Sequence, residues 1–239
     1  MSIHFIENTE GFTGKAQAYA TTRPGYPDEA INYIRSLAPT GAVFADIGAG
    51  TGKFTELIAR CGYEVFAIEP NDDMREQLAV TLAPFQNAKI INSTAEKTTL
   101  QGKSVDVITC SQSLGWLDLN AFRDECRRIG KTAGIVISLF NRTPGDTPPL
   151  NSHRYTSEQA SEIFFNKPTV LEYANPIHYS RERWLQFKAS ISDSPIPSDQ
   201  GYKAHIAEVN ATFDRRSVDG LLRIDFVTRI YIERIELLK

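Results

Sequence analysis

The chain has 239 residues, a formal net charge of −3 and a hydrophobic content of 41%. This length accommodates one large α/β domain with an embedded cap, or two small domains. The small negative charge creates no global attraction to phosphate backbones or anionic membranes, so we expect neither nucleic acid nor membrane as a partner. No run reaches the roughly 18 apolar residues of a membrane span, the first residues do not form a signal peptide, and the three cysteines are isolated. A cytoplasmic location is the expectation.

Between residues 41 and 140, short apolar runs alternate with amphipathic stretches. Near-continuous β-branched runs separated by helices indicate a parallel sheet that is covered on both faces. The predicted strands are 43–47, 64–69, 89–92, 105–109 and 134–139. The predicted helices are 53–61, a helix capped by Asn71 or Asp72, and 121–129.

The pattern changes after residue 140. Residues 141–149 form a loop because of their proline and glycine content. Thr156 and Gln159 make a capping box for a short helix. Residues 170–179 are predicted as an edge strand, because Pro176 cannot donate a ladder hydrogen bond.

The C-terminal part is predicted to hold two helices and a final strand. Ser180 caps the first helix, and the second covers about 201–213. A turn at Asp219-Gly220 leads into the strand, whose strict alternation predicts an antiparallel addition to the parallel sheet. Its apolar face holds Ile224, Phe226, Ile230 and Ile232, and its other face holds Arg223, Asp225, Arg229 and Tyr231.

The first strand ends in a glycine-rich turn that runs straight into a helix, with the sequence Asp46-Ile47-Gly48-Ala49-Gly50-Thr51-Gly52. Glycines permit positive φ and let the backbone approach a ligand closely. The N–H groups at the helix start then face an anionic group such as a carboxylate. Position 53 is lysine where the dinucleotide fingerprint requires glycine, which disfavours a nicotinamide cofactor.

Two carboxylates accompany this turn. Asp46 stands two residues before the first glycine, where it can reach a ligand's ammonium through a water or an adjacent amide. Glu69 ends the second strand, where an acidic side chain can accept both hydroxyls of a ribose. The glycine turn, the carboxylate placed to bind a ribose and the order of strands and helices together predict an adenosyl ligand.

With these residues the chain resembles the class I S-adenosylmethionine-dependent methyltransferases, specifically the type 11 branch that includes trans-aconitate methyltransferase-like enzymes. The resemblance implies S-adenosylmethionine as cofactor and S-adenosylhomocysteine as product. Residues 46–52 match the first family motif, and residues 68–74 the second, in which the acid binds ribose and the methionine packs near the adenine. The cofactor-binding residues expected from this match are Asp46, Gly48, Ala49, Gly50, Gly52, Glu69, Pro70, Met74, Thr94, Ala95, Glu96, Cys110 and Ser111.

The resemblance extends over nearly the whole chain and implies its architecture. Phe12, Ala16, Tyr19, Arg23, Pro24, Tyr26 and Pro27 reproduce a family pattern that in relatives folds over cofactor and substrate. The implied fold is α/β, a Rossmann-like seven-stranded sheet of order 3-2-1-4-5-7-6 with strand seven antiparallel and helices on both faces. We expect one domain over 1–239, with an N-terminal lid segment (1–40), a cofactor-binding core (41–140) and a substrate-side cap with strands six and seven (141–239). Relatives carry histidine before Trp116, where this chain has Gly115, so no proton-transfer role is expected there.

A sulfonium methyl is already activated, so the enzyme must mainly align it with a nucleophile. Proximity and orientation can supply about 7–11 kcal/mol, which makes a general base optional. His153 is the one candidate base, and Tyr19, Arg23, Tyr26, Trp116 and His153 are the candidate substrate-binding residues. Arg23 could pair with an acceptor carboxylate or tie the N-terminal segment to the sheet, and the second role is favoured. The four histidines are too scattered for a zinc site, so no metal is expected.

The function predicted from sequence is methyl transfer to a small-molecule acceptor, at oxygen, nitrogen or a carboxylate, by a monomer or homodimer. A non-catalytic or regulatory protein with the same fold is the alternative. A nicotinamide-dependent oxidoreductase is less favoured.

Overall fold

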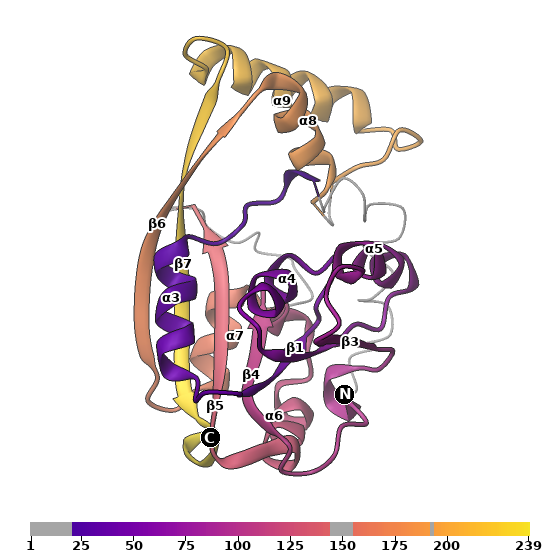
Figure 1. The fold of residues 1–239 in the computed structure, drawn as a ribbon. Helices are drawn as coiled ribbons and strands as arrows, with labels where there is room; N and C mark the ends of the chain where they lie inside the picture. Colours follow the sequence, from indigo (N-terminus) through magenta and orange to yellow (C-terminus); the bar gives the residue numbers. More distant parts are fainter. Residues whose placement is uncertain (1–20, 144–154, 192–193) are drawn as a thin grey trace.

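The computed structural model describes residues 21–143, 155–191 and 194–239. One mixed sheet has the strand order β3-β2-β1-β4-β5-β7-β6, as predicted (Figure 1). Strands β1 to β5 are parallel, and β7 pairs antiparallel with both β5 and β6. The strands are β1 (Val43–Ile47), β2 (Glu64–Ile68), β3 (Ala88–Ile91), β4 (Val105–Ser111), β5 (Gly130–Arg142), β6 (Thr169–Tyr179) and β7 (Leu222–Arg234).

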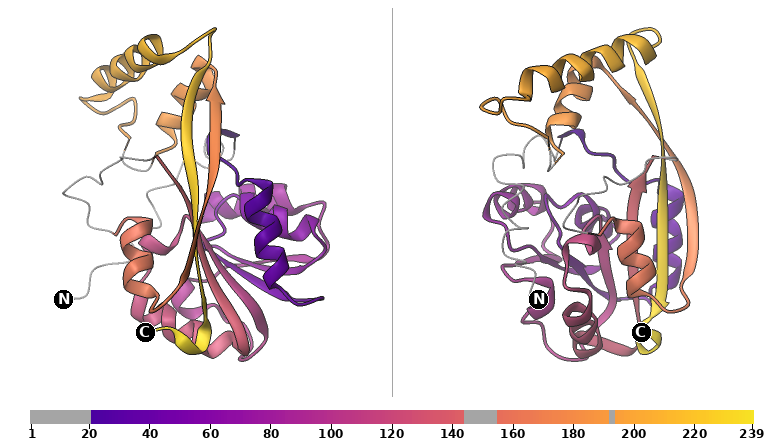
Figure 2. Two further views of the ribbon diagram at one scale, coloured as in Figure 1. Left: turned by 90° about the vertical axis from the view of Figure 1, so that its left-hand side faces the viewer. Right: turned by 180° about the vertical axis from the view of Figure 1, so that it is seen from behind.

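Helices cover both faces of this sheet (Figure 2). On one face, α3 and α4 bury Ile34 and Ile58 against Phe44 of β1. On the other face, α6 and α7 bury Phe122 and Phe164, whose rings stack with centroids 5.4 Å apart. The helices are α3 (Asp28–Leu37), α4 (Lys53–Arg60), α5 (Asp72–Leu82), α6 (Leu119–Ile129), α7 (Ser157–Phe164), α8 (Arg181–Ala189) and α9 (Tyr202–Arg216), with short 3₁₀ turns η1 (Ala95–Lys97), η2 (Leu114–Trp116) and η3 (Ile235–Leu237).

The predicted helix caps are present. The Asn71 side chain accepts a hydrogen bond from the Met74 amide at 2.9 Å, so α5 begins at Asp72. Thr156 and Gln159 make the reciprocal capping box of α7. Helix α6 begins two residues before its predicted start, because Asp118 caps it by accepting from the amides of the two residues after Leu119.

Two expectations about strands were wrong. The fifth strand, predicted over 134–139, is present but longer: it extends over Gly130–Arg142, because β4 pairs with its first residue and β7 pairs with it as far as Arg142. Tyr231, expected on the polar face of the last strand, is buried. Its ring stacks between those of Phe140 and Phe165, since residues beside α7 cover that side of the sheet at this point.

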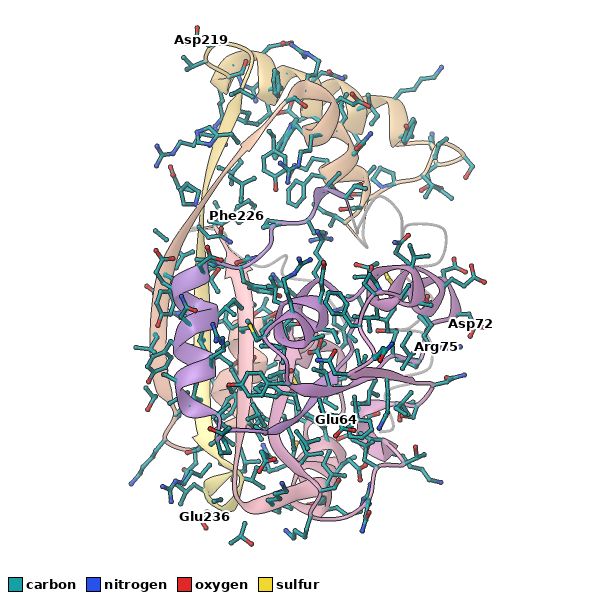
Figure 3. The ribbon with its side chains drawn as sticks, viewed as in Figure 1. Glu64, Asp72, Arg75, Asp219, Phe226 and Glu236 are labelled. Atoms are coloured by element: carbon teal, nitrogen blue, oxygen red, sulfur yellow. The ribbon has the colours of Figure 1, made fainter. Side chains whose placement is uncertain are left out.

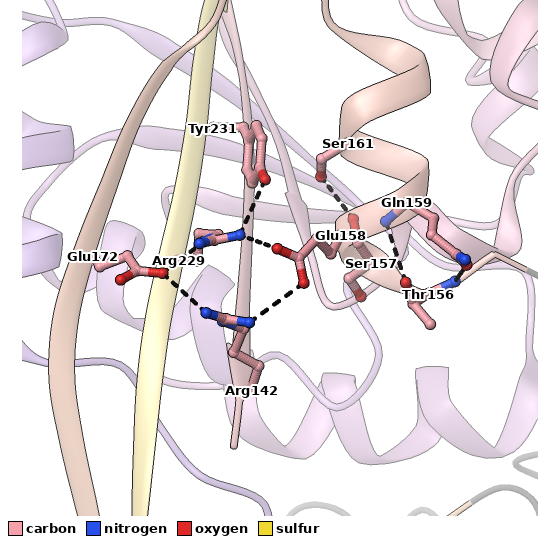
Figure 4. A network of polar contacts seen from close by, with 9 residues as sticks. All are labelled: Arg142, Thr156, Ser157, Glu158, Gln159, Ser161, Glu172, Arg229 and Tyr231. Atoms are coloured by element: carbon pink, nitrogen blue, oxygen red, sulfur yellow. Dashed lines mark hydrogen bonds and ion pairs between the residues drawn. The ribbon is translucent and has the colours of Figure 1, made fainter. Parts of the chain in front are cut away.

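A charged network attaches α7 to the antiparallel end of the sheet (Figure 4). Arg142 of β5 and Arg229 of β7 each pair with both Glu158 of α7 and Glu172 of β6. Arg229 also donates to the Tyr231 hydroxyl. Four charged side chains of balanced sign thus tie a helix to three strands, although their partial exposure limits the stabilisation that each pair provides.

Beyond the parallel part of the sheet, β6 and β7 continue upward and carry a cap formed by α8 and α9 (Figure 1). The cap has its own apolar cluster, in which Tyr179, Trp184 and Phe187 pack against Phe213 and Leu222. Figure 3 shows Phe226 where β7 passes from sheet to cap, and Asp219 at the far end of the cap. Among the described residues, no helix has both the length and the apolarity needed to cross a bilayer.

Candidate cofactor site

The glycine turn after β1 adopts the conformation that its sequence predicts. Gly48, Gly50 and Gly52 have φ of +65°, +57° and +89°. Only glycine adopts this left-handed region at little cost. Gly52 then caps α4, whose first N–H groups lie beside the turn.

The three glycines serve different purposes. A Cβ on Gly48 would lie 2.6 Å from the Cβ of Ser113, and one on Gly52 would lie 2.7 Å from Cδ1 of Leu78. A Cβ on Gly50 would meet nothing within 4 Å. Packing therefore explains the outer two glycines, whereas the middle one faces open space into which a ligand can enter.

Asp46 lies behind this turn and is fully buried. Its carboxylate accepts hydrogen bonds from Thr55 Oγ1 at 2.6 Å and Thr109 Oγ1 at 2.9 Å. Burial raises the pKa of this carboxyl to about 6, although both hydroxyls act in the opposite direction. The side chain links β1 to α4 and β4, so any effect on a ligand passes through the turn that it supports; direct contact with an ammonium stays a prediction.

Glu69 follows β2, directly beside the turn. Its Oε2 accepts from the Gly50 amide at 2.8 Å and its Oε1 accepts from the Asn71 amide at 2.9 Å. Burial raises the pKa of this carboxyl above its ordinary value, while the two amides lower it. Each carboxylate oxygen can accept more than one hydrogen bond, so the same group remains able to accept from ribose hydroxyls.

The residues expected around the adenine lie in the segments that follow β2 and β3, which include α5 and η1. Met74 is buried on α5, and Ala95 is buried on η1. Glu96 accepts a hydrogen bond from the Asp118 amide at 3.1 Å, which ties η1 to the start of α6. Pro70 is half-buried and Thr94 exposed. Their contacts with a nucleoside stay predictions.

A cavity opens between the glycine turn and the cap. It holds about 580 Å³ of empty space, a figure that includes open solvent at its mouth. Its core side comes from the glycine turn, the start of α4 and the ends of β4 and β5, and its other side from the segment before α3 and the cap. The lining residues are Gly48, Ala49, Gly50, Thr51, Lys53, Phe54, Ser111, Gln112 and Asn141 on the core side, and Arg23, Pro24, Tyr26, Phe187 and Phe226 on the other.

One buried polar group in this lining lacks a hydrogen-bond partner among the described residues. Thr51 Oγ1 is inaccessible to solvent and has no hydrogen-bond partner within the part of the chain that the structure describes. Buried hydroxyls normally have partners. Beside the open face of Gly50, this hydroxyl fits the polar amino-acid end of an adenosyl sulfonium.

The candidate acceptor residues divide into three groups. Arg23 and Tyr26 line the cavity. Trp116 lies half-buried on η2, outside the lining. Tyr19 and His153 lie outside the described residues.

Arg23 also has a structural contact, but with the cap rather than with the sheet as expected. Its Nη2 donates to the Ser190 carbonyl at 3.0 Å, and its guanidinium lies 5.5 Å from the centre of the Phe187 ring.

Gly115, where relatives carry histidine, has a packing explanation. A Cβ at this position would lie 2.4 Å from the Tyr155 carbonyl oxygen. The backbone that enters α7 therefore occupies the volume where a side chain would begin. Any residue other than glycine would require that segment to move.

Cys110 and Ser111 end β4. Cys110 is fully buried, and burial raises the pKa of its thiol well above the ordinary value. A thiol held neutral in an apolar environment is a poor nucleophile, which agrees with a packing role. Ser111 is only partly buried and lines the cavity.

Gln112 and Lys53 line the cavity as well and were not singled out as site residues. Gln112 has a φ of +65°, which is costly for a residue with a side chain. Burial and the nearby positive charge of Arg183 lower the pKa of Lys53. Their positions in the chain were the available signal, because Gln112 follows a parallel strand and Lys53 begins a helix.

Comparison with known proteins agrees with this geometry. Residues 45–138 match a family model described as a methyltransferase domain. An uncharacterized methyltransferase of Mycobacterium bovis is 32% identical over 130 residues, which are 54% of this chain and 51% of that protein. The match thus spans about half the length of this curated relative.

Solved structures share the fold at low identity. A protein described as a type II methyltransferase, from Anaeromyxobacter dehalogenans, superposes with a TM-score of 0.66 at 19% identity, over 89% of this chain and 98% of that one. The phosphoethanolamine N-methyltransferase 2 of Haemonchus contortus, solved with phosphomonomethylethanolamine and S-adenosylhomocysteine, superposes with a TM-score of 0.57 at 14% identity, over 98% of this chain and 60% of that one. The strand order, the glycine turn and the match over residues 45–138 agree with the fold and first motif expected of the class I S-adenosylmethionine-dependent methyltransferases.

Proposed function

We propose that this protein transfers a methyl group from S-adenosylmethionine to a small-molecule acceptor. The observation that carries the proposal is the cavity, which has the glycine turn as one wall and aromatic residues of the cap as the other. The methyl-bearing end of the cofactor and the acceptor would meet in this cleft, while Glu69, Met74 and Ala95 lie outside its lining. The Haemonchus contortus enzyme, which shares the fold, was solved with both phosphomonomethylethanolamine and S-adenosylhomocysteine, and this supports a site for a small molecule beside the cofactor.

The glycine turn and its neighbours are the residues that we assign to the cofactor. The open backbone face of Gly50 and the start of α4 would lie toward its amino-acid end, and Glu69 lies one strand away for its ribose. Met74 and Ala95 would pack near the adenine, as the family resemblance implies. When bound, the cofactor supplies an activated methyl on a positively charged sulfur.

The remaining chemistry is alignment. No histidine and no carboxylate of the described residues lines the cavity. Orientation therefore provides most of the acceleration, and an acceptor that carries a lone pair at neutral pH needs no general base. Ser111 and Gln112 can orient such an acceptor by hydrogen bonds, while Phe187 and Phe226 exclude water around it.

Binding measurements separate this proposal from the oxidoreductase alternative. Isothermal titration with S-adenosylmethionine, S-adenosylhomocysteine and NAD should give saturable binding for the two adenosyl compounds alone. Saturable NAD binding without adenosyl binding would refute it.

Transfer is tested separately, with radiolabelled S-adenosylmethionine and fractionated small molecules from cell extract. We expect a labelled small product. Tight cofactor binding without label in any fraction would support the non-catalytic alternative. The trans-aconitate-like branch, the atom that is methylated, the cytoplasmic location and the monomeric or dimeric state stay predictions.

A further inference from the structure

A short segment crosses from the cap to the sheet along one side of the cavity. Residues 22–26, named the strap here, run from beneath the cap to the start of α3 (Figure 1, indigo). Three of its five residues, Arg23, Pro24 and Tyr26, line the cavity. The position of the strap therefore sets the shape of that side of the site.

The cap holds the upper end of the strap. The Tyr179 hydroxyl donates to the Thr22 carbonyl at 3.5 Å, and both residues are fully buried. Arg23 donates to the Ser190 carbonyl and lies over the Phe187 ring. These contacts fix the strap to α8 and to the end of β6.

The sheet holds the lower end mainly through the Gly25 carbonyl, and Asn141 Nδ2 also lies 3.4 Å from the Pro24 carbonyl oxygen. The Gly25 oxygen accepts from Asn175 Nδ2 at 2.9 Å and from Asn141 Nδ2 at 3.0 Å. Asn141 is a cavity residue, but Asn175 is not. Asn175 is 8% exposed and sits on β6, the outermost strand of the sheet.

A third side chain orients both amides. Thr228 Oγ1 donates to Asn141 Oδ1 at 2.5 Å, and Asn175 Nδ2 lies 3.1 Å from the same oxygen and 3.3 Å from Thr228 Oγ1. With its oxygen engaged on the sheet side, the Asn141 amide must turn its nitrogen toward the strap. Polar side chains of β5, β7 and β6 thus form one connected network, and such a network is rigid when its members are satisfied.

We propose that Asn175 is a positioning residue for ligand binding, which acts through the Gly25 carbonyl to hold Arg23 and Tyr26 against the cavity. This inference rests on the proposed function, because it takes the cavity to be the ligand site. Asn175 touches no ligand in this arrangement. Asn175 keeps the strap ordered before a ligand arrives, so that binding does not carry the entropic cost of ordering it. Loss of Asn175 should therefore lower affinity more than it disturbs the fold.

The test uses S-adenosylhomocysteine as probe and the Asn175→Ala variant. Isothermal titration should show about tenfold weaker binding, the effect of losing one to two ordinary hydrogen bonds. Hydrogen exchange of a peptide covering residues 21–27 should become faster in the variant without ligand. Thr228→Val, nearly isosteric and still suited to a strand, should act in the same direction and serves if Asn175→Ala does not fold.

Asn87→Ala is the matched control. Asn87 Nδ2 also donates to two backbone carbonyls, those of Ala59 at 2.8 Å and Tyr63 at 2.7 Å, but it does not line the cavity. This variant should lose comparable stability while keeping wild-type affinity and wild-type exchange over residues 21–27.

Unchanged affinity or unchanged strap exchange in folded Asn175→Ala would overturn the inference, and so would an equal loss of affinity in Asn87→Ala. Failure of the wild-type protein to bind the probe would count against the proposed function instead. The exchange measurement then still decides whether Asn175 holds the strap.

Discussion

Replacement of Gly50 by valine tests whether the glycine turn approaches a ligand. The φ of +57° costs an L-residue about 1–2 kcal/mol, and the new side chain would enter a space where no protein atom lies within 4 Å of the Cβ. The fold should therefore survive with a modest loss of stability. The added methyl groups would occupy the volume next to Thr51 and Glu69, so S-adenosylhomocysteine binding should fall below detection.

Isothermal titration measures the affinity, and denaturant unfolding measures the stability of the same sample. Gly41→Val is the matched control, since Gly41 has a φ of +72°, an equally open Cβ direction and a place before β1, at the opposite end of that strand from the turn. It should lose similar stability and bind normally. Wild-type affinity in a folded Gly50→Val protein would show that ligand does not approach this turn.

Three further predictions concern the residues around the turn. Glu69→Ala should weaken S-adenosylhomocysteine binding by about 1.5–3 kcal/mol, the range for hydrogen bonds to a charged group, and an unchanged dissociation constant would remove Glu69 from the site. The Asp46 carboxyl has a pKa of about 6 when folded against an ordinary 3.8, so the folded chain binds more protons in that interval and stability should fall by about 3 kcal/mol as pH rises from about 4 to 6. Asp46→Asn should abolish this component in denaturant unfolding at pH 4 and pH 7, and identical pH dependence in both proteins would contradict the burial argument. Gly115→His should lower the melting temperature, because its Cβ would meet the Tyr155 carbonyl at 2.4 Å; a variant as stable as wild type would show that the entry to α7 moves freely.

Much of the core was predictable because its signals are local. Strand β1, the turn at 48–52 and the start of α4 follow one another in the chain, so apolar run, glycine spacing and helix start could be interpreted together. The capping side chains Asn71 and Thr156 act within three residues of their own position. Local signals do not determine the order of strands in the sheet, and the prediction of that order came from the family resemblance.

The wrong expectations came from contacts between distant segments. Tyr231 fits a polar alternation along its strand, yet aromatic rings 65 or more positions away cover it. Arg23 was expected to reach the sheet, but its partner is a carbonyl 167 residues later, in the cap.

From sequence alone, the chain's local chemistry was determined: a bare backbone turn, an acid one strand away and helices that begin at defined caps. These features depend on neighbouring residues and on the spacing of apolar residues, and both are present in the sequence itself. Tertiary structure alone decided that Asp46 supports the turn from behind, that Gly115 leaves room for the entry to α7, and that Asn175 and Asn141 meet at one carbonyl of the strap. Hydrogen bonds and close packing require atoms within a few ångströms, and only the folded sheet brings such distant residues that close.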